Sequence, residues 1–218
     1  MNFFNDLFTK RRGGIKLYTE YAWKALQNSY RYPKRAYHNW DHIEDCMKEL
    51  SILQSSGISF TGEDLATLAL LYHDCIYNPR ENDNEERSAE RALLDILALG
   101  FNNLYAIKVY DFIILTKHDK LSDDFAGKVV MDCDLAILGK DTQQFKDYET
   151  KIRMEYGYVP ECDYRKARIR FLKMVLEKEY IYHTEFFRNK YEKKARSNIM
   201  GSIERLLNKS TLSINSIH

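Results

Sequence analysis

Helix-breaking residues are scarce in this chain of 218 residues, which contains three prolines and nine glycines. Between them, apolar residues recur at the three- and four-residue spacing of one helix face. Two segments begin with pairs that resemble capping boxes, Thr61 with Asp64 and Asp83 with Glu86. We therefore expect an all-α fold, with helices at about 15–30, 40–54, 61–74, 83–99, 103–118, 123–138, 142–156, 162–179 and 184–207.

The length suits one sizeable core and is too short for two independent ones, so we expect a single domain over residues 1–207. The polar residues 208–218 are expected to form a mobile tail. A formal net charge of +1 gives no overall attraction to a nucleic acid polymer or a membrane. With no leader pattern and no apolar run of about 18 residues, a cytoplasmic location is expected.

A histidine and an aspartate lie side by side in the apolar run 70–76, whose helix is expected to be central to the core. Burying His73 next to Asp74 costs several kcal/mol unless a cation or a hydrogen-bond network compensates. A divalent metal ion would do so. One adjacent pair cannot fill a coordination sphere, so further ligands must come from other segments.

Other histidines and acids are candidates for the remaining ligands. His38 and His42 are four residues apart and share a face if both are helical. In the buried run 129–138, Asp134 lies nearer the apolar stripe, which leaves Asp132 as a supporting or surface group. His118 ends the expected face formed by Ile107, Asp111, Ile114 and Leu115, and is either a second-metal ligand or a satisfied core residue.

The four cysteines are widely spaced and form no Cys-x-x-Cys pair. Neither a zinc knuckle nor a dense disulfide framework is therefore indicated. We expect all four to be reduced core residues, namely Cys46, Cys75, Cys133 and Cys162.

The order of His42, the His73-Asp74 pair and Asp134, each in a separate helix, resembles the HD-domain superfamily of metal-dependent phosphohydrolases. Longer strings resemble an uncharacterised bacterial branch of predicted HD phosphohydrolases. These strings are Arg35-Ala36-Tyr37-His38-Asn39-Trp40-Asp41-His42-Ile43, Tyr72-His73-Asp74-Cys75-Ile76-Tyr77, Asn84-Glu85-Glu86-Arg87-Ser88-Ala89 and Asp132-Cys133-Asp134-Leu135-Ala136-Ile137-Leu138-Gly139. The resemblance implies an HD-type helical bundle with additional C-terminal helices.

The resemblance also implies roles for individual residues. The metal ligands would be His42, His73, Asp74 and Asp134, because the family's ligand histidine is followed by core positions that here are Cys46, Met47 and Leu50. His38 would then lie at the rim as a substrate contact or a second-metal contact. Such ligands suit Mn²⁺, Fe²⁺, Co²⁺, Ni²⁺ or Zn²⁺, with open positions for water.

A general acid or base is still needed, and the preferred candidate, by resemblance, is Glu85. Glu86 and Asp41 are alternatives, and the two glutamates could merely complement a helix N-terminus. For phosphate binding, Arg35 is favoured because it lies close in sequence to the metal site. The other basic cluster, Arg165, Lys166, Arg168 and Arg170, has the pattern of a solvated helix face.

The leading hypothesis is hydrolysis of a small phosphorylated metabolite or nucleotide by a metal-activated water. A di-iron oxygenase on the same scaffold is the first alternative. The second is a non-catalytic sensor that binds a metal or a nucleotide. The sequence indicates neither the natural substrate nor the oligomeric state.

Overall fold

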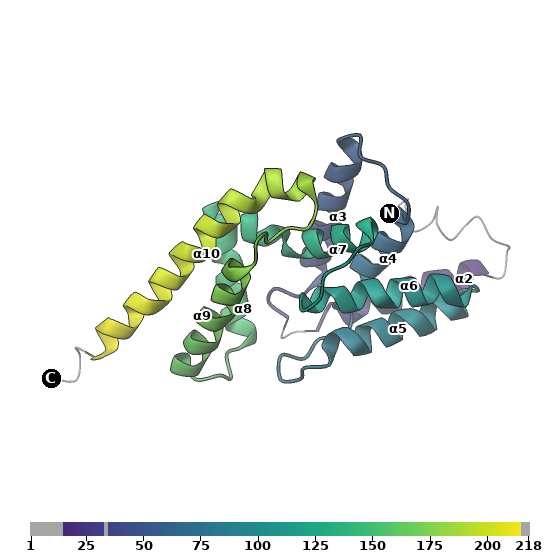
Figure 1. Ribbon diagram of the computed structural model, residues 1–218. Coiled ribbons are helices and arrows are strands. Elements are labelled where there is room, and N and C mark those ends of the chain that lie inside the picture. The colour runs from purple at the N-terminus through teal and green to yellow at the C-terminus, as the bar shows by residue number, and fades with distance from the viewer. Residues whose placement is uncertain (1–14, 33–34, 215–218) are drawn as a thin grey trace. The chain divides into compact units, whose positions relative to one another are not determined.

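The computed structural model describes residues 15–32 and 35–214, and all regular secondary structure over these residues is helical (Figure 1). The expected all-α fold is therefore confirmed. The elements are α2 (Ile15–Ser29), α3 (Trp40–Ser55), α4 (Glu63–Tyr72), α5 (Asn84–Ala98), α6 (Asn103–Ile114), η1 (Leu115–Lys117), α7 (Phe125–Asp134), η2 (Leu135–Gly139), α8 (Thr142–Glu155), α9 (Glu161–Glu177) and α10 (Glu185–Ile214).

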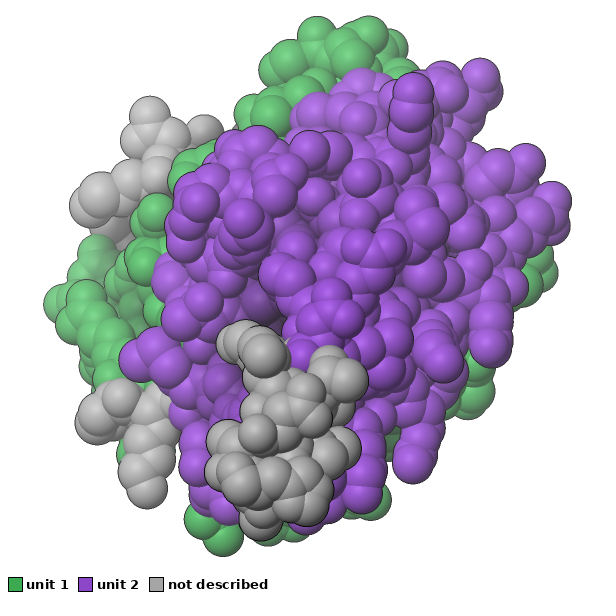
Figure 2. Space-filling view, turned by 90° about the vertical axis from the view of Figure 1, so that its left-hand side faces the viewer, with its two compact units in different colours: residues 1–134 green, residues 135–218 purple. Residues whose placement is uncertain are grey.

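The chain divides into two compact units, residues 1–134 and residues 135–218, coloured separately in Figure 2. The first unit contains α2 to α7, and the second contains η2 to α10. The boundary expected near Leu207 lies inside α10, which continues to Ile214. The last part of the expected tail, residues 215–218, lies outside the described residues.

Helix α4 is the centre of the first unit, as its apolar sequence predicts. Every residue from Ala66 to Tyr72 is buried, and the helix packs against α3, α5, α6 and α7. A helix surrounded on all sides cannot carry a polar face. The polar residues His73 and Asp74 accordingly follow immediately after its last residue, Tyr72, where the chain leaves the helix.

The expected capping boxes are not formed. Helix α4 begins after Gly62, which has a left-handed backbone (φ 90°), and no side chain caps it. Asp83 precedes α5, but its side chain accepts no capping hydrogen bond. The predicted stop at Gly100 is confirmed, because its φ of 84° is a conformation that glycine adopts without strain.

The buried face of α6 differs from the expected one. Ala106, Val109, Phe112 and Ile113 are buried, whereas Ile107 and Asp111 are exposed. Both stripes contain apolar residues, so periodicity alone could not separate them. The α-helix also ends at Ile114, and a short 3₁₀ turn leads to His118.

In the second unit, α10 packs against η2 and α9. Gly139 ends η2, as predicted, and its role is close packing, because an added Cβ would lie 2.4 Å from Cβ of Tyr191. Of the helices within 15–32 and 35–214, none combines the length and apolar character that crossing a bilayer requires.

Candidate metal centre

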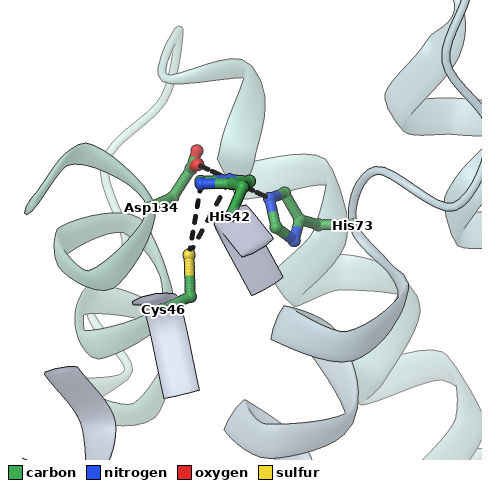
Figure 3. A group of neighbouring side chains, drawn as sticks. All are labelled: His42, Cys46, His73 and Asp134. Carbon is green, nitrogen blue, oxygen red and sulfur yellow. Dashed lines mark hydrogen bonds and ion pairs between the residues drawn. The ribbon is translucent and has the colours of Figure 1, made fainter. Parts of the chain in front are cut away.

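Four of the residues predicted to bind a metal come together within the first unit. His42 lies in the first turn of α3, where the side chain of Asn39 caps the helix by accepting from the Asp41 amide. His73 and Asp74 follow α4, and Asp134 is the last residue of α7. The ends of three helices thus bring these side chains to one place. Figure 3 draws His42, His73 and Asp134.

The donor atoms are spaced as ligands of a single ion would be. The Nε2 atoms of His42 and His73 are 3.1 Å apart, and Oδ1 of Asp134 lies 3.2 Å and 3.5 Å from them, respectively. Oδ2 of Asp74 is 3.2 Å from Nε2 of His73 and 3.7 Å from Nε2 of His42. Atoms that share an ion at about 2.1 Å lie about 3.0–3.4 Å from each other, so the spacing fits a metal.

The orientation of His73 is also that of a metal ligand. Its Nδ1 lies 2.8 Å from the carbonyl oxygen of Leu70, one turn earlier in α4. A carbonyl only accepts, so Nδ1 carries the proton and, in the neutral ring, Nε2 presents a lone pair to the cluster. A hydrogen bond of this kind commonly fixes the tautomer of a ligating histidine.

Both carboxylates are held in the ionised form. Burial alone would raise the pKa of Asp134, but hydrogen bonds from His118, His42 and His73 hold that pKa well below its usual range. Burial also raises the pKa of Asp74. The nearby His73 is the largest of the influences that lower it, and the pKa of Asp74 ends below its usual value. For His73, burial lowers the pKa, but the two carboxylates outweigh burial and raise it. The cluster therefore favours positive charge at its centre.

Cys46 is a fifth donor beside these four, although its sequence pattern predicted a core residue. Its sulfur lies 3.7 Å from Nε2 and 3.8 Å from Nδ1 of His42. Ligand atoms of His42, Cys46, His73 and Asp134 all lie within 4.8 Å of one another. Its position four residues after His42 was the signal that could have identified it. Burial raises the pKa of the Cys46 thiol well above its usual range.

His118 reaches the same cluster from a position that the sequence did not predict. It is the non-glycine residue with a positive φ, 56°, among the described residues, and lies outside any helix. Its Nε2 is 2.8 Å from Oδ2 of Asp134, whereas His42 lies close to Oδ1 of the same carboxylate. A histidine with a left-handed backbone is strained, so favourable contacts with its surroundings must compensate for the free energy of that strain. Whether His118 also binds a second ion stays a prediction.

His38 lies at the rim and is partly exposed. Its ring stacks on Tyr77, with centroids 4.2 Å apart. The guanidinium of Arg35 donates to the carbonyls of His38, Asp74 and Cys75, at 3.2, 2.5 and 3.2 Å. Arg35 thus ties the segment before α3 to the residues after α4. Its predicted contact with a phosphate stays a prediction.

Glu85 lies in the first turn of α5 and is partly buried. Burial raises the pKa of its carboxyl group, and the negative charge of Asp74 adds to this effect. Its neighbour Glu86 instead forms an ion pair with Lys117. Asp41, the third candidate, is exposed on α3. Of the three, Glu85 has the environment that suits a proton donor.

Three other expectations need correction. Asp132 is fully buried, which excludes the surface position and leaves the supporting one. Cys162 is exposed, whereas Cys46, Cys75 and Cys133 are buried as expected. Arg165 and Arg168 are buried in α9, so that basic cluster is not a wholly solvated face.

Comparisons with known proteins add no assignment: the chain matches no family model, no curated protein and no solved structure.

Proposed function

We propose that this protein is a metal-dependent phosphohydrolase of the HD-domain type, which cleaves the phosphate ester of a small metabolite or nucleotide. The observation that carries the proposal is the convergence of His42, His73, Asp74 and Asp134 on one point. These segments are up to 92 residues apart in the sequence (134 minus 42). Their order is the one that the resemblance implies.

The residues fit a divalent ion. Two imidazoles and two ionised carboxylates form the donor set. In its neutral form, His73 keeps its proton on Nδ1 for the Leu70 carbonyl and leaves Nε2 for an ion. This mixture of nitrogen and oxygen donors suits Mn²⁺, Fe²⁺, Co²⁺, Ni²⁺ or Zn²⁺. When bound, such an ion supplies a water of lowered pKa and a positive charge for a phosphoryl oxygen.

The surrounding residues have separate roles in the proposal. Glu85, whose pKa is raised by burial, is the group that transfers a proton to the leaving oxygen. His38, stacked on Tyr77 at the rim, contacts the substrate. Arg35 positions both the His38 segment and the main chain of Asp74 through its three carbonyl contacts. Cytoplasmic location and the absence of nucleic acid or membrane partners belong to the same proposal.

A second candidate is a di-iron oxygenase. The contact between His118 and Asp134 favours it, because Asp134 has one oxygen toward His42 and the other toward His118 and could bridge two ions. An oxygenase would contain about two equivalents of iron and consume oxygen. A phosphohydrolase would release inorganic phosphate without oxygen.

The test is metal analysis of protein purified without chelator, followed by a phosphatase screen over a broad panel of phosphorylated metabolites. We expect roughly one or two equivalents of a transition metal and metal-dependent release of phosphate. Protein that retains no divalent metal, and whose melting temperature does not respond to added metal or chelator, would contradict the proposal.

A further inference from the structure

The sulfur of Cys46 lies where a ligand of the proposed ion would lie. Cys46 follows His42 by four residues on α3, so both side chains point from the same face of the helix. The sulfur contacts the His42 ring and is drawn beside the two imidazoles and Asp134 in Figure 3. It is 2% exposed, so water does not compete for it.

The distances allow the sulfur to join the ion with small movements. Nitrogen and sulfur ligands at about 2.1 and 2.3 Å from a tetrahedral ion are about 3.6 Å apart. The Cys46 sulfur is 3.7 Å from Nε2 of His42. Because all four donor atoms lie within 4.8 Å of one another, side-chain shifts on the order of 1 Å bring them around one ion.

Another buried cysteine close in sequence to a ligand has a different contact. Cys75 follows Asp74, but its sulfur lies 4.0 Å from the carbonyl oxygen of Ser88. A cysteine that merely fills the core needs no particular neighbour for its sulfur. The two cysteines therefore differ in what the sulfur contacts. The sulfur of Cys46 lies against the ring of the proposed ligand His42, which points to a role in the metal centre.

We propose that Cys46 is a thiolate ligand of the metal centre, together with His42, His73 and Asp134. This inference rests on the metal centre of the proposed function, and it restricts the set of ions that the centre would prefer. Thiolates favour borderline and soft ions such as Zn²⁺, Co²⁺ and Fe²⁺, whereas Mn²⁺ and Mg²⁺ prefer oxygen donors. Asp74 remains near the imidazoles as an additional oxygen donor.

The test is the absorption spectrum of the full chain loaded with Co²⁺. A thiolate bound to Co²⁺ produces an intense near-ultraviolet charge-transfer band, which ligand sets of only nitrogen and oxygen lack. We expect this band in the wild type and in the control variants Cys133→Ser and Cys162→Ser, and its loss in Cys46→Ser. The ratio of Zn²⁺ to Mn²⁺ affinity should fall at least about tenfold in Cys46→Ser.

The outcomes separate the two proposals. Wild-type protein that binds Co²⁺ with visible d–d bands but without the charge-transfer band overturns Cys46 ligation and leaves the metal centre intact. Protein that binds no Co²⁺ overturns both. If Cys46→Ser does not fold, cadmium NMR of the wild type decides, because a sulfur ligand moves the resonance downfield and its absence there refutes the inference.

Discussion

The two units of this chain use buried and partly buried polar side chains in different ways. In unit 2, Arg196 donates to the carbonyls of Leu176, Lys178 and Glu179, and Asn198 donates to those of Leu138 and Lys140. These side chains satisfy main-chain groups where helices end. In unit 1, imidazoles and carboxylates face one another. In unit 2 the donors and acceptors pair within the protein. In unit 1 the negative charge of the carboxylates favours a bound cation.

The largest expected effect is loss of the metal from unit 1. Asp74→Ala should abolish both metal retention and hydrolysis, because the carboxylate supplies charge to the ion. Metal content of purified variants and phosphate release measure this. The matched control is Asp163→Ala, an exposed acid in unit 2, which should keep both. Full metal content in Asp74→Ala would remove Asp74 from the ligand set.

A second comparison separates two histidines of the same segment. His42→Ala should lose the metal, because its Nε2 contacts both His73 and Asp134. His38→Ala should keep most of one equivalent and change kcat or KM, because its ring stacks on Tyr77 at the rim. Elemental analysis and steady-state kinetics of the two variants check this. Equal metal loss in both would indicate a centre with two ions.

A third comparison concerns two acids of α7. Asp134→Asn should eliminate activity with a nearly unchanged fold. Asp132→Asn should retain the metal and lose activity by at most about 10- to 100-fold, as for groups that support a ligand. Circular dichroism controls for folding, and metal content discriminates between the variants. If both fold but only Asp132→Asn lacks metal, the ligand assignment on this helix must be reversed.

In unit 2, a change of similar chemistry should affect stability alone. Arg196→Ala removes the guanidinium that donates to three carbonyls and to Glu192, and Glu192 keeps only its backbone amide donors. We expect the free energy of unfolding to fall by about 1–3 kcal/mol. Urea denaturation measures this, and the metal content should equal that of the wild type. Loss of metal in Arg196→Ala would show that the functional division between the units is wrong.

The smallest expected effect is a difference in thiol reactivity. Native protein should be alkylated at Cys162 in unit 2, while the buried thiols of unit 1 react slowly. Burial raises the pKa of Cys75 to about 12, so Cys75 stays protonated and unreactive when the pH is raised from 7 to about 9. Peptide mass spectrometry identifies the labelled residues. Rapid labelling of Cys75 would contradict its burial.

The sequence by itself determined the helical fold, because scarce breakers and apolar periodicity are local properties. It also singled out His73, Asp74 and Asp134 as candidate ligands, since acids and histidines in apolar runs need a compensating partner when buried. The choice of His42 over His38 came from the family resemblance instead. The helix end at Gly100 was predicted from a local preference, because glycine adopts a left-handed backbone without strain. Gly139 also lies at a predicted end, but what requires glycine there is close packing against Tyr191.

Only the tertiary structure decided which groups meet. The left-handed backbone of His118, the closeness of the Cys46 sulfur to His73 and Asp134, and the contacts of Arg35 with the carbonyls of Asp74 and Cys75 all depend on packing between distant segments. The same holds for the buried face of α6, where two apolar stripes compete and the neighbouring helices determine which one is covered. Local pattern fixes the period of a helix, but its orientation follows from the free energy of the whole core.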